Sequence, residues 1–391
     1  MRRFLLTAFA LVNDTALQAG SPWSVLWAGP GILFASLMIA WGAEATQFFL
    51  AQGIALAMLA LLQTLPEFAA EAIFAWHHEI SLLFASLTGA LMLLTGIGWP
   101  MIYFSAASSY RRQKKEPMRR IRLEEDQAIQ VVSLFAAIAY EFVVWWKGSL
   151  NIYDGVVLLA IYVGYLWIMR KLPPEEAETL DEISGVPRAI VLAPKGVRIL
   201  SIGALFLIGG TAVFMLANPF LAGLFGVSVI VGVSRFQFVQ WIYPLVSEAP
   251  EGVSAYYWAR DYDRASIALM NLVSSNINQW TLLAALLPAV LSLSMRQPTS
   301  IPLDPMQSQD LLLALSQSLL GALFLVNMEL AWWEAAGLFV AFIFQLRWRE
   351  LHPLITGIYL GWSAVEVIRL ISGNRKAEAI GNFRKIMQST K

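Results

Sequence analysis

Long apolar runs separated by short polar breaks cover most of the chain. A helix needs about 20 apolar residues to cross the hydrocarbon core of a bilayer, and most of the runs approach or exceed that length. The pattern therefore predicts ten or eleven transmembrane helices and an all-α polytopic membrane protein. The runs fall at residues 24–44, 48–76, 80–104, 127–146, 153–169, 198–230, 234–258, 265–294, 309–328, 331–346 and 354–371.

The charged loops predict how these helices are oriented. The segment 111–122 is short and strongly basic, and such loops stay on the cytoplasmic side of a membrane. Counting outward places the N-terminus outside and the loop 171–197 inside, so two five-helix halves start on opposite sides. Such inverted-topology repeats are common in secondary transporters. Arg347 and Arg349 would then fall outside, unless the run 331–346 does not cross fully or the last run is an appended helix.

The same pattern divides the chain into five parts. We expect an interfacial segment, a first membrane repeat, a cytoplasmic linker, a second membrane repeat, and an additional C-terminal helix with a basic tail. Apolar residues at helical spacing in that tail predict an interfacial helix, and a disordered tail is the alternative. The parts are 1–23, 24–170, 171–197, 198–346 and 347–391, and the apolar tail residues are Ile380, Phe383, Ile386 and Met387.

Composition supports a membrane protein and excludes several other classes. Of the 391 residues, 58% are hydrophobic and 14% are charged, whereas a soluble domain carries about 25% charged residues. The chain has no cysteine, so disulfides and thiolate metal sites are excluded. Nucleotide-binding and nucleophile-elbow motifs do not occur in a credible context. We therefore expect no enzymatic activity, no cofactor, and no nucleotide or nucleic-acid partner.

Two prolyl-glutamate steps interrupt the apolar sequence at corresponding places in the two halves. They are Gln63-Thr64-Leu65-Pro66-Glu67 and Ser247-Glu248-Ala249-Pro250-Glu251. A charge in the centre of a membrane helix costs about 2.5–3.5 kcal/mol on insertion scales. Proline removes a backbone donor and frees carbonyl oxygens nearby, so each helix should open beside its carboxylate. We interpret the two steps as halves of one ion-binding centre, and simple proline kinks are the alternative.

A second polar segment follows each prolyl-glutamate step. When the halves are laid over one another at Pro66 and Pro250, Ser86 aligns with Asn271, Ala90 with Ser275, and Leu94 with Gln279. The second half therefore carries side-chain oxygens where the first half has two apolar residues.

These motifs resemble those of the cation/calcium antiporter superfamily, which includes the sodium/calcium exchangers. Its two inverted repeats carry a G-T-S-L-P-E-like motif followed by G-N-x-x-G-S-N-I-F-N. Here Gly232-Val233-Ser234 through Glu251 has the spacing of the first motif, and Asn271 to Gln279 is similar to the second. The resemblance runs from about residue 30 to residue 345 and implies the fold of two inverted five-helix repeats.

The resemblance also implies a set of ion ligands. The two liganding glutamates of the family correspond to Glu67 and Glu251, and Glu248 adds a third carboxylate that could hold a metal ion. The other implied ion-binding residues are Gln63, Thr64, Ser247, Asn271, Ser275, Asn276 and Gln279. The sequence departs from the family at Ala90 and Leu94, which offer no ligand.

The expected function is secondary active antiport by alternating access at a midplane carboxylate site. Calcium or sodium would be exchanged for sodium or protons, since calcium prefers six to eight hard oxygen ligands and clustered carboxylates take up protons. The alternative is a non-transporting or channel-like protein that keeps a degenerate exchanger scaffold. Either way we expect a multi-pass protein of a plasma or inner membrane, with membrane lipids and transported cations as its partners.

Overall fold

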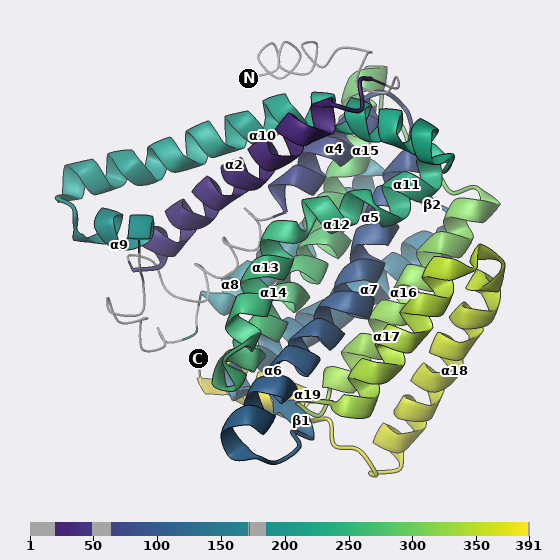
Figure 1. Cartoon of the computed structure of the whole chain (residues 1–391). Helices are drawn as coiled ribbons and strands as arrows, with labels where there is room; N and C mark the ends of the chain where they lie inside the picture. The colour runs from purple at the N-terminus through teal and green to yellow at the C-terminus, as the bar shows by residue number, and fades with distance from the viewer. Residues whose placement is uncertain (1–19, 49–63, 171, 173–184, 390–391) are drawn as a thin grey trace. The chain divides into compact units, whose positions relative to one another are not determined.

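The computed structural model describes residues 20–48, 64–170, 172 and 185–389 (Figure 1). These residues group into two compact units that alternate along the chain. Among the described residues, the first unit takes 20–48, 64–86, 172, 185–250 and 289–298, and the second takes 87–170, 251–288 and 299–389. Each unit therefore contains pieces from both halves of the sequence.

The first unit is built mainly from six helices among the described residues. They are α2 (Ser24–Gln47), α4 (Leu65–Trp76), α9 (Gly185–Leu192), α10 (Lys195–Val231), α11 (Arg235–Trp241) and α12 (Tyr243–Ser247), together with the start of α5 (Ile80–Leu93) and the end of α15 (Ala284–Met295).

Helices α2 and α10 lie side by side along most of their length (Figure 1). Glycines permit this close approach, because a Cβ at Gly209 would lie 2.9 Å from the Ala35 carbonyl oxygen and one at Gly223 would lie 3.0 Å from the Val25 backbone nitrogen. Small residues serve the same purpose wherever membrane helices pack closely. Helix α4 packs against α10 and α12, which places the start of α4 beside the end of α12.

The second unit contains the remaining helices and four short strands. Its helices are α6 (Trp99–Lys114), α7 (Ala128–Lys147), α8 (Ile152–Met169), α13 (Ala249–Ala259, from Glu251 on), α14 (Ala265–Asn278), α16 (Pro305–Leu325), α17 (Trp332–Arg347), α18 (His352–Ile371) and α19 (Glu378–Ser389), with π-helical turns at Leu94–Gly98 and Gln279–Leu283 and 3₁₀ turns at Glu125–Gln127, Tyr262–Arg264 and Arg349–Leu351. Strand β1 (Arg120–Arg122) pairs antiparallel with β4 (Glu329–Ala331), and β2 (Ser149–Leu150) pairs with β3 (Ile301–Pro302).

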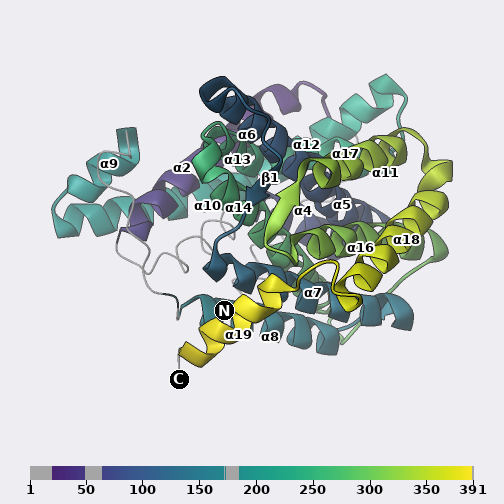
Figure 2. The ribbon, with the colours of Figure 1, turned by 90° about the horizontal axis from the view of Figure 1, so that it is seen from below.

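Helix α7 packs against α8, α14, α16 and α19 in this unit (Figure 2). Polar side chains join three of these helices: the Gln130 amide on α7 donates to the Ser274 hydroxyl on α14 at 3.4 Å, and the Tyr165 hydroxyl on α8 lies 3.1 Å from the same oxygen. Hydrogen bonds of this kind hold membrane helices together. They fix α14, which carries most of the second polar motif.

The helices confirm an all-α polytopic membrane protein. Seven helices among the described residues are long and apolar enough to cross a membrane, and each coincides with a predicted run. They are Ile80–Lys114, Glu125–Lys147, Ile152–Met169, Lys195–Val231, Tyr262–Met295, Pro305–Leu325 and Arg349–Ile371. The run 24–44 corresponds to α2, and the run 331–346 corresponds to α17.

Other parts of the prediction differ from the structure or lie outside it. The run 234–258 was expected as one helix that opens at its proline, and it forms three short helices, α11 to α13. The predicted linker 171–197 contains α9 and the start of α10. The tail forms a helix, α19. The interfacial helix predicted within 1–23 and the first part of the run 48–76 lie outside the described residues.

Candidate ion-binding site

The first prolyl-glutamate step forms the N-terminus of a helix. Helix α4 begins at Leu65, with Thr64 at the N-cap position and Pro66 and Glu67 in its first turn. Proline is tolerated there because the first backbone N–H groups of a helix have no partner within it. A carboxylate in the first turn is also favoured by the helix dipole. Thr64 and Glu67 are both fully buried, so an acidic side chain is held at a helix start inside the protein.

The second step repeats this local design. Helix α12 ends at Ser247 and α13 begins at Ala249, so the helical structure is interrupted at Glu248. The Glu248 N–H still donates to the Pro244 carbonyl at 2.9 Å. Pro250 and Glu251 then stand in the first turn of α13. Glu248 and Glu251 are 4% and 0% exposed, which means that this break also presents buried carboxylates.

Two buried glutamates of the first unit bring their carboxylates close enough together to hold a metal ion. In the first unit, carboxylate oxygens of Glu67 and Glu248 lie within 4.8 Å of each other. The same limit holds for Glu248 and Glu251, which are three residues apart along the chain. Negative charges this close repel strongly in a low-dielectric interior. The arrangement is stabilised when a cation, or protons, bind between the carboxylates.

Hydroxyl groups lie beside these carboxylates in the first unit. Thr64 immediately precedes α4, and Ser247 is the last residue of α12 and is buried. Tyr243 begins α12 and is also buried. It interacts electrostatically with Glu67 and Glu248. Sequence reasoning missed Tyr243, although its position one helical turn before Ser247 is the signal that would have found it. Gln63 lies outside the described residues.

The predicted ligands of the second motif are all on or next to α14 in the second unit. Asn271, Ser275 and Gln279 follow one another at four-residue spacing and therefore share one face of the helix. Their exposed fractions are 4%, 0% and 0%, so this polar face is buried. Gln279 begins a π-helical turn, and such turns are frequent at functional sites.

Asn276 differs from its neighbours. Its amide nitrogen donates to the Thr95 hydroxyl at 3.3 Å, which joins α14 to the π-helical turn that follows α5. The Ser275 hydroxyl and the Asn276 side-chain oxygen have no hydrogen-bond partner among the described residues. Asn276 is therefore placed to brace α14 against this turn through its amide nitrogen, a contact that sequence reasoning did not foresee, and its role as an ion ligand stays a prediction.

A buried carboxylate outside the predicted set lies one turn beyond Glu67. Glu71 is fully buried in α4, with Ser86 as a polar neighbour. The i, i+4 spacing places Glu71 on the same side of α4 as Glu67. The first unit therefore holds three buried carboxyl groups within and around the break between α12 and α13.

Comparison with known proteins identifies the family. A family model described as sodium/calcium exchanger protein matches residues 20–171 and 201–349. The chain belongs to this family. It is a membrane transporter and not an enzyme. The match ends before α18 and α19, which follow residue 351.

Two solved exchangers are similar to this family member in structure. A crystal structure of the H⁺/Ca²⁺ exchanger CAX matches with 31% sequence identity and a TM-score of 0.86, covering 99% of this chain and 95% of that one. The sodium–calcium exchanger NCX_Mj, soaked with Na⁺ and Ca²⁺, matches with 18% identity and a TM-score of 0.54, covering 83% of this chain and 96% of that one. The second likeness concerns the fold alone. A sequence search of curated proteins gives no match.

Proposed function

We propose that the protein is a secondary active antiporter that exchanges Ca²⁺ for protons, with Glu67, Glu248 and Glu251 as the carboxylate ligands of the transported ion. The observation that carries the proposal is that the N-terminus of α4 and the break after α12 bring the buried carboxylates of Glu67 and Glu248 within 4.8 Å of each other. A structural kink requires no such convergence of negative charge, whereas a cation site does.

The chemistry of the surrounding residues favours a divalent cation. Calcium takes six to eight oxygen ligands at 2.3–2.6 Å, drawn from carboxylates, amide and hydroxyl oxygens, and water. Carboxylates supply the charge here, while Thr64, Ser247, Ser275 and Gln279 supply neutral oxygens of the required kind. Cargo with two positive charges also balances clustered carboxylates better than one sodium ion does.

The first repeat supports protons as the counter-ion. Ala90 and Leu94 stand where the second repeat has Ser275 and Gln279, and both are buried. Separate sodium sites would need oxygens that these side chains do not supply. Protons need none, because the carboxylates themselves take up protons when the cation leaves and their mutual repulsion is no longer offset. The similarity to a protein described as an H⁺/Ca²⁺ exchanger agrees with this choice.

The test is uptake of radiolabelled calcium into proteoliposomes that contain the full chain. An outward proton gradient and an outward sodium gradient are applied in separate experiments. We expect uptake with the proton gradient, none above background with the sodium gradient, and loss of uptake in Glu67→Gln and Glu251→Gln. Glu79→Gln, which changes an exposed carboxylate in the turn after α4, is the matched control.

Other outcomes would change the proposal in defined ways. Uptake driven by sodium alone would retain antiport and reject proton coupling. Uptake that persists in both variants would reject the glutamates as ligands. A folded protein without gradient-driven calcium uptake would leave two functions open: transport of another cation, or a scaffold that does not transport.

A further inference from the structure

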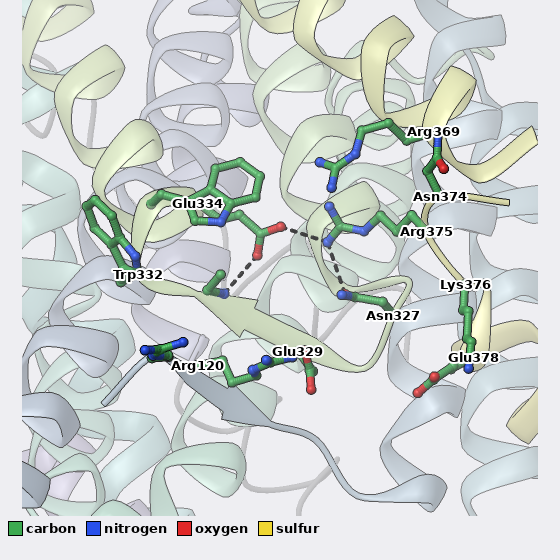
Figure 3. Close-up of a pocket in the computed structure, with 13 residues that line it drawn as sticks. Arg120, Asn327, Glu329, Trp332, Glu334, Arg369, Asn374, Arg375, Lys376 and Glu378 are labelled. Atoms are coloured by element: carbon green, nitrogen blue, oxygen red, sulfur yellow. Dashed lines mark hydrogen bonds and ion pairs between the residues drawn. The ribbon is translucent and has the colours of Figure 1, made fainter. Parts of the chain in front are cut away.

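A second site lies in the second unit, formed by residues that the transport proposal does not use. It is a cavity of about 500 Å³ (Figure 3). The cavity is bordered by the segment after α6, by β4 and the start of α17, and by the segment between α18 and α19. Arg369, Arg375 and Lys376 come from beyond residue 349, where the family match ends. The site therefore combines the family scaffold with the C-terminal extension.

The lining of the cavity is predominantly basic. Five basic side chains face three carboxylates: Arg119, Arg120, Arg369, Arg375 and Lys376 against Glu329, Glu334 and Glu378. Two further charged residues contact the lining: Glu366 accepts a hydrogen bond from Arg375, and Arg122 lies 3.6 Å from Glu329. Because one is negative and the other positive, they do not change the net charge. The excess of positive charge favours an anionic ligand.

One arginine forms part of the wall and is not available to a ligand. Arg375 is 6% exposed and donates to Glu366 at 2.6 Å, to Glu334 at 2.7 Å and to the Asn327 side-chain oxygen at 3.0 Å. A buried arginine bound by two carboxylates is strongly held in place. It fixes the segment between α18 and α19 against α16 and α17.

Of the remaining basic groups, Arg120 is paired with Glu329, and the other three are more accessible. Arg119 and Lys376 are exposed, and no ion pair for either is found among the described residues. Arg369 contacts Glu366 at 2.9 Å and lies over the Trp333 ring, 6.0 Å from its centroid. Trp333 in turn stacks on Trp362. Arg119 and Lys376 are thus free to contact a ligand at a cavity whose wall is rigid.

The cavity lies at the membrane–water boundary. The spanning helices α6, α16 and α18 all end near it, and α17 begins there. Trp332 on its rim is 57% exposed, and exposed tryptophan is typical of the headgroup level of a bilayer. The segment 111–122 belongs to this end, and its basic residues predict that this end is cytoplasmic. The cytoplasmic leaflet is the one that carries anionic lipids.

The anionic ligand could be a soluble phosphate or the phosphate of a lipid headgroup. The amphipathic helix α19 favours the lipid. It begins at Glu378, two residues after Lys376, and its partly exposed apolar residues include Ile380, which is 46% exposed. Helix α19 packs against α7, and the part of its apolar face that stays exposed, which includes Ile380, faces the acyl chains when such a helix lies in the headgroup region. A soluble phosphate would make no use of that face. A lipid would contact both the basic cavity and α19.

We propose that the cavity binds the phosphate headgroup of an anionic phospholipid. Arg119 and Lys376 contact the phosphate, Arg369 adds positive charge, and Trp332 lies against the glycerol region. The site uses none of the carboxylates of the transport proposal, so either proposal can be rejected without affecting the other.

Binding to the purified full chain tests this site without a transport measurement. The probes are short-chain phosphatidylglycerol, short-chain phosphatidylcholine and inorganic phosphate, with native mass spectrometry and the shift of the melting temperature as readouts. The test variant is Arg119→Gln/Lys376→Gln. The control is Arg111→Gln/Arg112→Gln, which removes the same charge from exposed positions at the end of α6 outside the cavity.

We expect phosphatidylglycerol to bind and stabilise the wild type and the control, and phosphatidylcholine to do neither. In the test variant, binding should weaken by about tenfold or more, because each basic residue near an anionic headgroup contributes to affinity. Equal binding of inorganic phosphate would overturn the lipid assignment in favour of a small anion. Equal weakening in both variant pairs, or none in the test variant, would also reject the site. The melting temperature without lipid shows that each variant is folded.

Discussion

The helices that carry the second motif in the two repeats have similar backbones and different side chains. Helix α5 is followed by a π-helical turn that begins at Leu94, and α14 by one that begins at Gln279. These are the residues that sequence alignment pairs. One turn earlier, Ala90 stands opposite Ser275. The repeat is therefore present in the backbone, while at these two aligned positions only α14 and the turn after it carry side-chain oxygens.

The prolyl-glutamate steps differ in the same direction. Thr64 precedes the first step at the position that Glu248 holds in the second, and both residues are buried. The second repeat thus has an added carboxylate as well as the added hydroxyl and amide. In the proposed function this asymmetry means that most ligands of one divalent cation come from the second repeat. The experiments below act on differences between the repeats, in order of decreasing expected effect.

The largest effect is expected when the extra carboxylate is replaced by its counterpart from the first repeat. Glu248→Thr should weaken calcium affinity by roughly a hundredfold, since removing one buried charged partner costs about 2–5 kcal/mol. Protons compete with the cation for this carboxylate in the wild type, so its calcium affinity should fall as the pH falls. That dependence should flatten in the variant. Calcium uptake at a series of pH values measures both effects.

Glu79→Gln is the control for this change, because it removes an exposed carboxylate from the turn after α4. It should leave both the affinity and its pH dependence unchanged. A Glu248→Thr protein with wild-type calcium affinity would show that Glu248 is not a ligand, and an unaltered pH profile would assign the proton to another carboxylate.

A smaller loss is expected when the neutral ligands of α14 are removed. Ser275→Ala/Gln279→Leu gives the second repeat the side chains of the first at the aligned positions. Calcium affinity should fall by roughly tenfold to a hundredfold, because a contact between a neutral group and a charge contributes about 1.5–3 kcal/mol. The concentration for half-maximal uptake is the measurement. Ser266→Ala, on the same helix but two turns before Ser275, should have no such effect.

Sequence analysis predicted the positions of most spanning helices because their apolar runs are long and end at clear polar breaks. It also identified the buried glutamates, because a charge inside an apolar run is conspicuous. It did not predict that the run 234–258 breaks into three helices, since the hydrophobic pattern does not show where backbone hydrogen bonds are lost. It missed Tyr243 and the bracing contact of Asn276 with Thr95, which depend on the packing of helices that are distant in sequence.

The two π-helical turns differ in how they pack, and this predicts an effect on stability. A Cβ at Gly96 would lie 2.4 Å from a ring carbon of Phe342 on α17, whereas the aligned turn has the larger Thr281. Gly96→Ala should destabilise the protein by about 1–3 kcal/mol, the usual cost of overpacking a core. The melting temperature should fall accordingly. Gly210→Ala on α10 is the control, because a Cβ there meets nothing within 4 Å, and its melting temperature should not fall.

The smallest effect is expected when the missing oxygens are given to the first repeat. Ala90→Ser/Leu94→Gln introduces the second repeat's side chains at positions that are 0% and 3% exposed. We expect at most a few-fold change in calcium affinity, because the added polar groups must be desolvated before they can act as ligands. If Ala90 and Leu94 are the reason that sodium does not drive exchange, the variant should gain sodium-driven calcium uptake. Unchanged coupling in a folded variant would show that proton coupling is set by the carboxylates and not by the oxygens absent from α5.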